Sequence, residues 1–186
     1  MLNDLEVNIA SGLIYPAEYI LSPNCDKRPD NIEVNLIVIH SISLPPATYG
    51  SGCIEHLFMN TLDEEADPYF NEIKGLKVSA HLLVSREGII TQFVPFHLRA
   101  WHAGRSIYKG RENCNDFSIG IELEGTDQDS FEDIQYMQLA KLVRVLREAY
   151  PAMMDADIIG HSDIAPGRKA DPGIGFNWNY FFGVLG

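Results

Sequence analysis

The chain has 186 residues, 46% of them hydrophobic and 22% charged, and its formal net charge at pH 7 is −12. This length suits a single domain with one hydrophobic core, and the composition is typical of a globular protein. The acidic balance argues against nucleic acid as a partner, because proteins that bind a phosphate backbone carry a basic surface.

The sequence predicts no association with a membrane. No apolar run is long enough to span a bilayer, and Asp4 and Glu6 stand where a secretory signal requires cations. The three cysteines are far apart, which favours free thiols in a reducing compartment over disulfides. We therefore expect a cytoplasmic protein, and we expect it to act as a monomer.

The first part of the chain carries no residues that suggest chemistry. We expect residues 1–31 to form a leader that packs on the core, with a short helical turn near residues 16–20. Residues 32–186 are expected to form the functional domain.

The first strand of that domain is the apolar run Leu36–His40, which is typical of a strand buried on both faces. His40 ends this strand, at a position where functional side chains are often found. The irregular loop 41–52 is then expected to rim a pocket, and apolar residues at helical spacing predict a short helix over 54–58.

A β-hairpin is predicted from two apolar runs, residues 78–84 and 89–94, which a polar turn ending in glycine joins. His81 in the first run is either a further metal ligand or a buried, hydrogen-bonded core histidine, and the second reading is favoured. His56 and His97 are interpreted as ordinary structural residues.

Residues 117–125 alternate as a half-buried strand does. One face carries Phe117, Ile119, Ile121 and Leu123, and the other carries Ser118, Gly120, Glu122 and Glu124. A glycine on the second face leaves room for a ligand. An acid near the end of that face is either a solvated charge or a general base, and the pattern leaves both open.

The last third of the chain predicts a long amphipathic helix, a strand and a closing helix. The helix begins at a capping box formed by Ser130 and Asp133 and ends before Pro151; the strand covers residues 157–160, and the closing helix covers residues 178–184. Strands interleaved with helices, plus one hairpin, indicate a single α/β (α+β) domain with a mixed central sheet flanked by helices.

The segment 161–173 is rich in proline and glycine and too irregular for a helix or a strand, so its polar side chains are candidates for function. It brings His161, Lys169 and Asp171 close together in sequence. Imidazole and carboxylate are ordinary zinc ligands, and three protein ligands plus a water are typical of catalytic zinc. With His40 as the third ligand, the sequence predicts a catalytic zinc site.

Several motifs in this order resemble the cytoplasmic zinc amidases of the AmpD type. They are His40 with Ser43–Pro46, Ser79–His81, Ala100–Gly104, Asn115–Gly125, Gly160–His161, Ile164–Pro166, Arg168–Lys169 and Asp171–Gly173. The resemblance begins near residue 30 and implies an amidase-like fold. It also implies a bacterial enzyme that cleaves anhydro-N-acetylmuramyl peptides, its small-molecule substrates, during cell-wall recycling.

The resemblance implies that Zn2+ is held by His40, His161 and Asp171, with Glu122 and Lys169 as the catalytic pair. Zinc activates a water at neutral pH and polarises the lactyl carbonyl of the scissile amide. Glu122 would take a proton from the water and deliver it to the departing alanine nitrogen. Lys169 would face the oxyanion, with a surface ion pair as the alternative.

Further substrate contacts are implied at six positions. They are Ser41, Lys77, Trp101, Asn113, Ala165 and Arg168. Ser41 and Asn113 depart from the asparagine and arginine expected there, which bears on affinity and side-chain preference rather than on the reaction. Trp101 either covers the sugar or peptide or is a half-buried core residue.

Two other functions are open to this scaffold. One is a peptidoglycan-binding module without catalysis, which predicts a broken ligand set, whereas His40, His161 and Asp171 are all present. The other is a protein that binds a macromolecular partner, as phage lysozymes of this family do.

Overall fold

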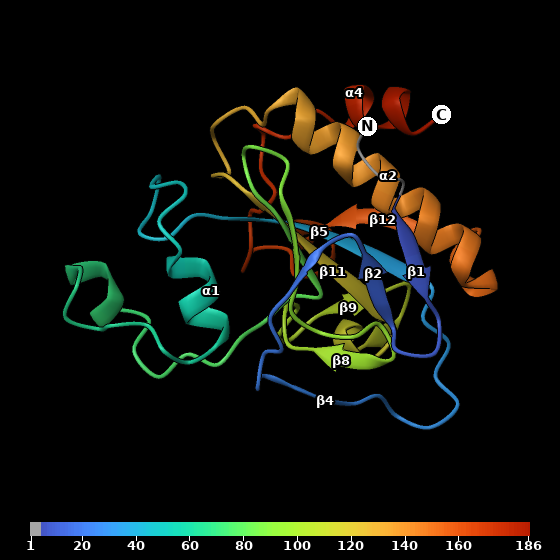
Figure 1. Ribbon diagram of the computed structural model, residues 1–186, viewed down its shortest axis with the longest axis horizontal. Helices are drawn as coiled ribbons and strands as arrows, with labels where there is room; N and C mark the ends of the chain where they lie inside the picture. Colours follow the sequence, from blue (N-terminus) through green and yellow to red (C-terminus); the bar gives the residue numbers. More distant parts are fainter. Residues whose placement is uncertain (1–4) are drawn as a thin grey trace.

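The structure is a computed structural model that describes residues 5–186, and its centre is a six-stranded mixed sheet (Figure 1). In order across the sheet, its strands are β12 (Asp157–Gly160), β5 (Leu36–Ile42), β11 (Ser118–Glu124), β6 (Leu82–Val84), β7 (Ile90–Gln92) and β3 (Glu18–Tyr19). Neighbours run parallel except β6 and β7, which form the predicted antiparallel hairpin. The mixed sheet confirms the fold class predicted from the sequence.

The central strands β5 and β11 determine which side chains share a face. They pair in parallel, with Glu122 opposite His40 and Ile121 opposite Ile39. Ile39 and Ile121 belong to the main hydrophobic core. Because successive side chains alternate and paired residues share a face, His40 and Glu122 both project from the other face.

Two helices cover the face that carries the main core, α2 (Asp133–Ala149) and α4 (Trp178–Leu185) (Figure 1). The buried side of α2 consists of Gln135, Tyr136, Leu139, Ala140, Leu142, Val143 and Leu146. The predicted capping box at Ser130 and Asp133 is wrong. Phe131 is buried before the helix starts, so Glu132 becomes the N-cap, and its N–H donates to Gln135 Oε1 at 3.0 Å.

A second apolar cluster supports the predicted helix α1 (Cys53–Phe58) beside the sheet; it includes Leu44, Phe58, Phe70 and Phe93. The remaining elements are β4 (Cys25–Lys27), η1 (Pro68–Asn71), β8 (Leu98–Ala100), β9 (Ile107–Tyr108), β10 (Arg111–Glu112), η2 (Cys114–Asp116), η3 (Pro151–Met153) and α3 (His161–Ile164). Within residues 5–186, no helix has the length and apolar character needed to cross a bilayer.

The N-terminal part contributes strands, not the helical turn predicted near residues 16–20. β1 (Glu6–Asn8) and β2 (Leu13–Tyr15) form a hairpin, and β3 extends the central sheet beside β7. Gln92 of β7 explains the difference, because its backbone carbonyl accepts from Ile20 N at 2.9 Å. The backbone there is bonded to the sheet and not to itself.

Candidate active site

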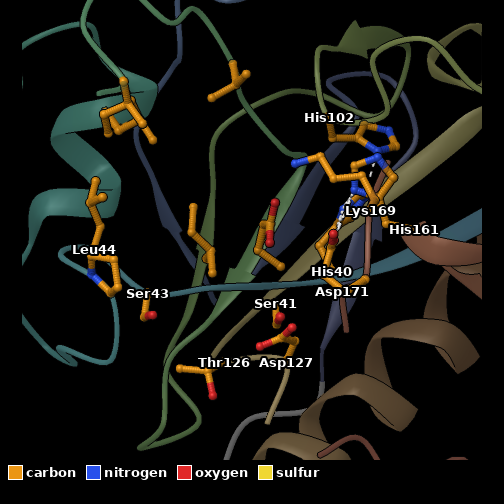
Figure 2. A pocket seen from close by; sticks show the side chains of 18 of the residues that line it. His40, Ser41, Ser43, Leu44, His102, Thr126, Asp127, His161, Lys169 and Asp171 are labelled. Atoms are coloured by element: carbon orange, nitrogen blue, oxygen red, sulfur yellow. Dashed lines mark hydrogen bonds and ion pairs between the residues drawn. The ribbon is translucent and has the colours of Figure 1, made fainter. Parts of the chain in front are cut away.

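Three separate elements bring His40, His161 and Asp171 together (Figure 2). His40 lies on β5, and His161 follows β12, the parallel neighbour of β5. Asp171 returns to the same place because its carbonyl accepts a hydrogen bond from Ser162 N at 3.0 Å. The segment predicted to be wholly irregular starts with the one-turn helix α3, where the Asp163 carboxylate accepts from Gly160 N at 2.7 Å.

The donor atoms of the three residues form a triangle with equal sides. His40 Nδ1 and His161 Nδ1 are 3.0 Å apart, and each lies 3.0 Å from Asp171 Oδ2. A tetrahedral zinc with bonds of about 2.0 Å separates its ligand atoms by roughly 3.3 Å, so the triangle is close to the size a metal requires. The donor set therefore fits a divalent metal.

The protonation of the three side chains is also compatible with metal binding. His161 Nε2 lies 3.1 Å from the carbonyl of Ala103, which can only accept, so Nε2 carries the proton and Nδ1 presents a lone pair. Burial lowers the pKa of His40 to about 4. Burial opposes ionisation of Asp171, but the neighbouring imidazoles of His161 and His40 outweigh it and hold the pKa of that carboxyl well below its usual range. The site therefore offers a neutral His40 imidazole and an Asp171 carboxylate at neutral pH, together with Nδ1 of His161, and these are groups that bind metals.

Glu122 is the buried acid beside this triangle. It pairs in register with His40, its side chain is 8% exposed, and Oε2 has no hydrogen-bond partner among residues 5–186. Burial, and then repulsion from Asp171, raise the pKa of Glu122 well above its usual value, while the positive charge of Lys169 acts in the opposite direction. The carboxylate of Glu122 therefore binds a proton more strongly than an exposed glutamate does, as a general base requires.

Glu124 sits two residues further along the same face and has a different environment. One carboxylate oxygen accepts from Gly50 N at 2.5 Å, and the other accepts from Arg86 N at 3.2 Å. Glu124 therefore ties the rim loop, residues 41–52, to the turn of the β6–β7 hairpin. Its oxygens are occupied by backbone donors, unlike the free oxygen of Glu122.

Lys169 is exposed and lies beside His40, His161 and Asp171 (Figure 2). Its charge is close enough to influence the pKa of both Glu122 and His40. Of the ion pairs found within residues 5–186, none involves Lys169, which disfavours the surface ion pair considered above. Its ammonium group remains available to a ligand.

The triangle lies in a cavity of about 800 Å3, within the usual size range of ligand sites. Its polar end holds the metal-site residues, Glu122 and Lys169. An apolar arm extends toward α1, and its lining includes Leu44, Leu57, Phe58, Tyr69 and Ile73. The rim loop lines the cavity, as predicted, and residues 125–129 line it as well.

Residues 30–174 match the family described as N-acetylmuramoyl-L-alanine amidase. The chain belongs to this amidase family. The chain is 53% identical over 170 residues to the 1,6-anhydro-N-acetylmuramyl-L-alanine amidase AmpD of Salmonella typhimurium, which covers 91% of this chain and 90% of the relative.

Solved structures agree with this amidase assignment. A crystal structure of a selenomethionine AmpD derivative superposes with a TM-score of 0.92 at 49% identity, covering 97% of this chain and 99% of that chain. The Escherichia coli amidase AmiD, solved with the substrate anhydro-N-acetylmuramic acid-L-Ala-D-γ-Glu-L-Lys, matches with a TM-score of 0.58 at 28% identity over 85% of this chain and 60% of that chain.

The predicted substrate residues of this amidase fall into two groups. Ser41 lines the cavity. Lys77 lines a smaller hollow that shares Leu57, Ile73 and Leu76 with the cavity. The other four, Trp101, Asn113, Ala165 and Arg168, do not line the cavity within the described chain.

Those four have other contacts or positions in this structure. Arg168 donates to the carbonyls of Ala103 and Arg105 at 2.7 and 2.8 Å, and Ala165 is buried. Trp101 is half-buried, and Asn113 is exposed before η2 with a φ of 58°. That these four residues contact the substrate therefore stays a prediction.

Sequence reasoning missed the side chain that fills the space beside Gly120. A Cβ at Gly120 would lie 2.4 Å from the His102 ring, so the glycine makes room for this histidine and not for a ligand. His81 lies just before β6 and is fully buried; it accepts from Gly120 N and contacts the Leu98 carbonyl. Its environment is that of a hydrogen-bonded core histidine. The signal for His102 was its place in the motif Ala100–Gly104.

Proposed function

We propose that this chain is a zinc-dependent amidase that acts on anhydro-N-acetylmuramyl peptides in peptidoglycan recycling. It hydrolyses the amide bond between the lactyl group of the sugar and L-alanine of the stem peptide. The observation that carries this proposal is the triangle of His40 Nδ1, His161 Nδ1 and Asp171 Oδ2, with sides of 3.0 Å. Beside it lies the carboxyl of Glu122, whose Oε2 has no hydrogen-bond partner within residues 5–186. The complete ligand set disfavours a module that only binds peptidoglycan.

We infer that the metal is zinc and that His40, His161 and Asp171 hold it. Two imidazoles and one carboxylate leave a fourth position open, which is the arrangement of catalytic zinc sites. When bound, zinc supplies an activated water and polarises the scissile carbonyl.

Glu122 is the general base and acid of the proposed reaction. Burial and the nearby Asp171 raise its pKa, so the carboxylate accepts a proton more readily than an exposed glutamate does. Having taken a proton from water, it can return this proton to the departing amine, which must leave as a neutral group. Oε2 of Glu122, which has no hydrogen-bond partner in the described part of the chain, is free for this transfer.

Lys169 is proposed to stabilise the negative charge that develops on the substrate carbonyl oxygen. It has no ion-pair partner within residues 5–186 and lies at the polar end of the cavity. A positive charge held at that point favours the transition state over the neutral amide.

The cavity suggests how the substrate is held. We place the reacting lactyl group at the polar end, near Ser41, and the rest of the muropeptide along the arm that leads to the hollow of Lys77. We also propose a monomer with a leader at residues 1–31 and a catalytic domain at residues 32–186. The free Cys25, Cys53 and Cys114 are compatible with the cytoplasm as its compartment.

Incubation with an anhydro-N-acetylmuramyl tripeptide tests the function. Mass spectrometry should show a free tripeptide and the anhydro sugar, and both products should form at least about a hundredfold more slowly with Glu122→Gln. Intact substrate after incubation with the zinc-loaded wild-type protein would refute the proposal.

A further inference from the structure

A buried chain of hydrogen bonds leads from the backbone of η2 to the metal triangle. His40 Nε2 lies 2.9 Å from His102 Nδ1, and His102 Nε2 lies 3.2 Å from Ser118 Oγ. Ser118 Oγ lies 2.6 Å from the backbone carbonyl of Cys114. All four residues are at most 8% exposed, so no solvent competes for these bonds.

The donor and the acceptor of every hydrogen bond in this series follow from the backbone carbonyl of Cys114. The Cys114 carbonyl can only accept, so the single hydroxyl proton of Ser118 is donated to it. Ser118 Oγ then offers only lone pairs to the imidazole of His102, and His102 Nε2 must be the N–H that donates to it. His102 Nδ1 is therefore unprotonated in the neutral ring.

The same rule continues into the metal site. Because His102 Nδ1 carries a lone pair, the 2.9 Å contact is a hydrogen bond only if His40 Nε2 is the donor. His40 then has its other lone pair on Nδ1, the atom that faces His161 and Asp171. We propose that His102 and Ser118 are positioning residues that fix the tautomer of His40 and so present its Nδ1 to the metal.

The two ligand histidines differ in how their tautomers are fixed. His161 donates to the carbonyl of Ala103, a backbone group that no substitution removes. His40 depends instead on the side chains of His102 and Ser118. The consequence for zinc affinity rests on the proposed zinc site, whereas the tautomer of His102 follows from the protein alone.

The fold holds His102 rigidly in this role. Asn115 Oδ1 accepts from His102 N at 3.1 Å and from Ala103 N at 2.8 Å. The Arg28 guanidinium donates in turn to the Asn115 carbonyl at 3.0 Å. On its other side the ring is packed against Gly120, where any side chain would collide with it. Figure 2 shows the ring next to the ligand histidines.

Nitrogen-15 NMR of histidine-labelled, metal-free protein tests the tautomer directly. We expect His102 to show a protonated Nε2 and an unprotonated Nδ1, and Ser118→Ala to lose this single form. A protonated Nδ1 on His102 in the wild-type protein would overturn the inference, whatever metal the protein binds.

Zinc affinity, measured by competition with a chelator, tests the consequence. In His102→Asn, Oδ1 takes the place of Nδ1 and still accepts from His40, so the dissociation constant should stay within a few-fold of wild type. In His102→Leu the acceptor is lost at similar volume, and zinc should bind roughly 10- to 100-fold more weakly.

The order of the two variants separates positioning from packing. If His102 only filled space, the larger leucine would preserve the site better than asparagine, and that order would refute the proposal. Circular dichroism of both variants checks that they fold. A wild-type protein that binds no zinc would contradict the proposed function, and the NMR spectrum would still decide the tautomer.

Discussion

Glu122 and Glu124 project from the same face of β11, yet the structure predicts opposite results for their replacement by glutamine. Glu122 is buried with one oxygen unpaired among the described residues, whereas both oxygens of Glu124 accept backbone N–H groups. We expect Glu122→Gln to remove activity without loss of stability, and Glu124→Gln to remove stability with most activity retained.

The pKa of Glu122 gives the sign of its effect on stability. This pKa is raised above its ordinary value of 4.5, mainly by burial and then by Asp171. The folded state therefore binds the proton more strongly than the unfolded state does, and the stability of metal-free wild-type protein falls as pH rises from 4.5 toward the raised pKa. Glutamine does not titrate, so metal-free Glu122→Gln should lack this loss and be at least as stable as wild type at pH 7. Its turnover should fall by about 10²- to 10⁴-fold.

Glutamine at position 124 keeps one acceptor oxygen but turns an amide N–H toward the second backbone donor. Leaving that donor unsatisfied costs about 1–3 kcal/mol. For a domain of this size, the loss lowers the melting temperature by roughly 2–12 °C. Because Gly50 belongs to the rim loop, KM should rise, while kcat should stay within a few-fold of wild type.

Two measurements distinguish the roles of Glu122 and Glu124. Thermal unfolding of the metal-free proteins between pH 4.5 and 8, followed by circular dichroism, gives the stability differences, and peptide release by the zinc-loaded proteins gives kcat and KM. Turnover that survives in Glu122→Gln and disappears in Glu124→Gln would move the general base to Glu124 and refute the reasoning.

Three other outcomes are expected. His161→Ala should lose nearly all of the single zinc expected per chain, because two ligands remain; full zinc retention by elemental analysis would contradict the ligand assignment. Lys169→Met should lower kcat about a hundredfold with KM little changed, since charge is removed and length is kept; a raised KM with kcat intact would mean that Lys169 binds the substrate instead. Zinc in hundredfold excess over its dissociation constant should add about 2.7 kcal/mol of stability, seen as a higher melting temperature than with chelator; equal melting temperatures would show that zinc does not bind the folded state.

The ligand triangle could be predicted because each ligand carries a local signal. His40 ends an apolar run that predicts a buried strand, although β5 continues to Ile42, and His161 follows a second short strand. The proline and glycine residues around Asp171 indicate a loop of restricted shape. Residue type, together with a position near the end of a strand or in a loop of restricted shape, was enough to suggest that these side chains meet.

The features that were missed depend on contacts between distant parts of the chain. β3 forms because the backbone of Ile20 is bonded to that of Gln92, and the local sequence of a two-residue strand does not predict this pairing. The buried chain of hydrogen bonds through His102 requires Ser118 of β11 to face the His102 ring. A histidine in a sequence motif does not reveal which atoms its ring contacts. Helix α2 starts later than the capping pattern at Ser130 predicts, because Phe131 is buried before the helix begins.

Titration of zinc into metal-free protein, with peptide release from an anhydro-N-acetylmuramyl tripeptide followed at each step, tests the central claim most directly. Release should rise in proportion to zinc and level off at one zinc per chain, because His40, His161 and Asp171 form a single site. Release that is equally fast without metal, or a chain that binds one zinc and leaves the tripeptide uncleaved, would contradict the account.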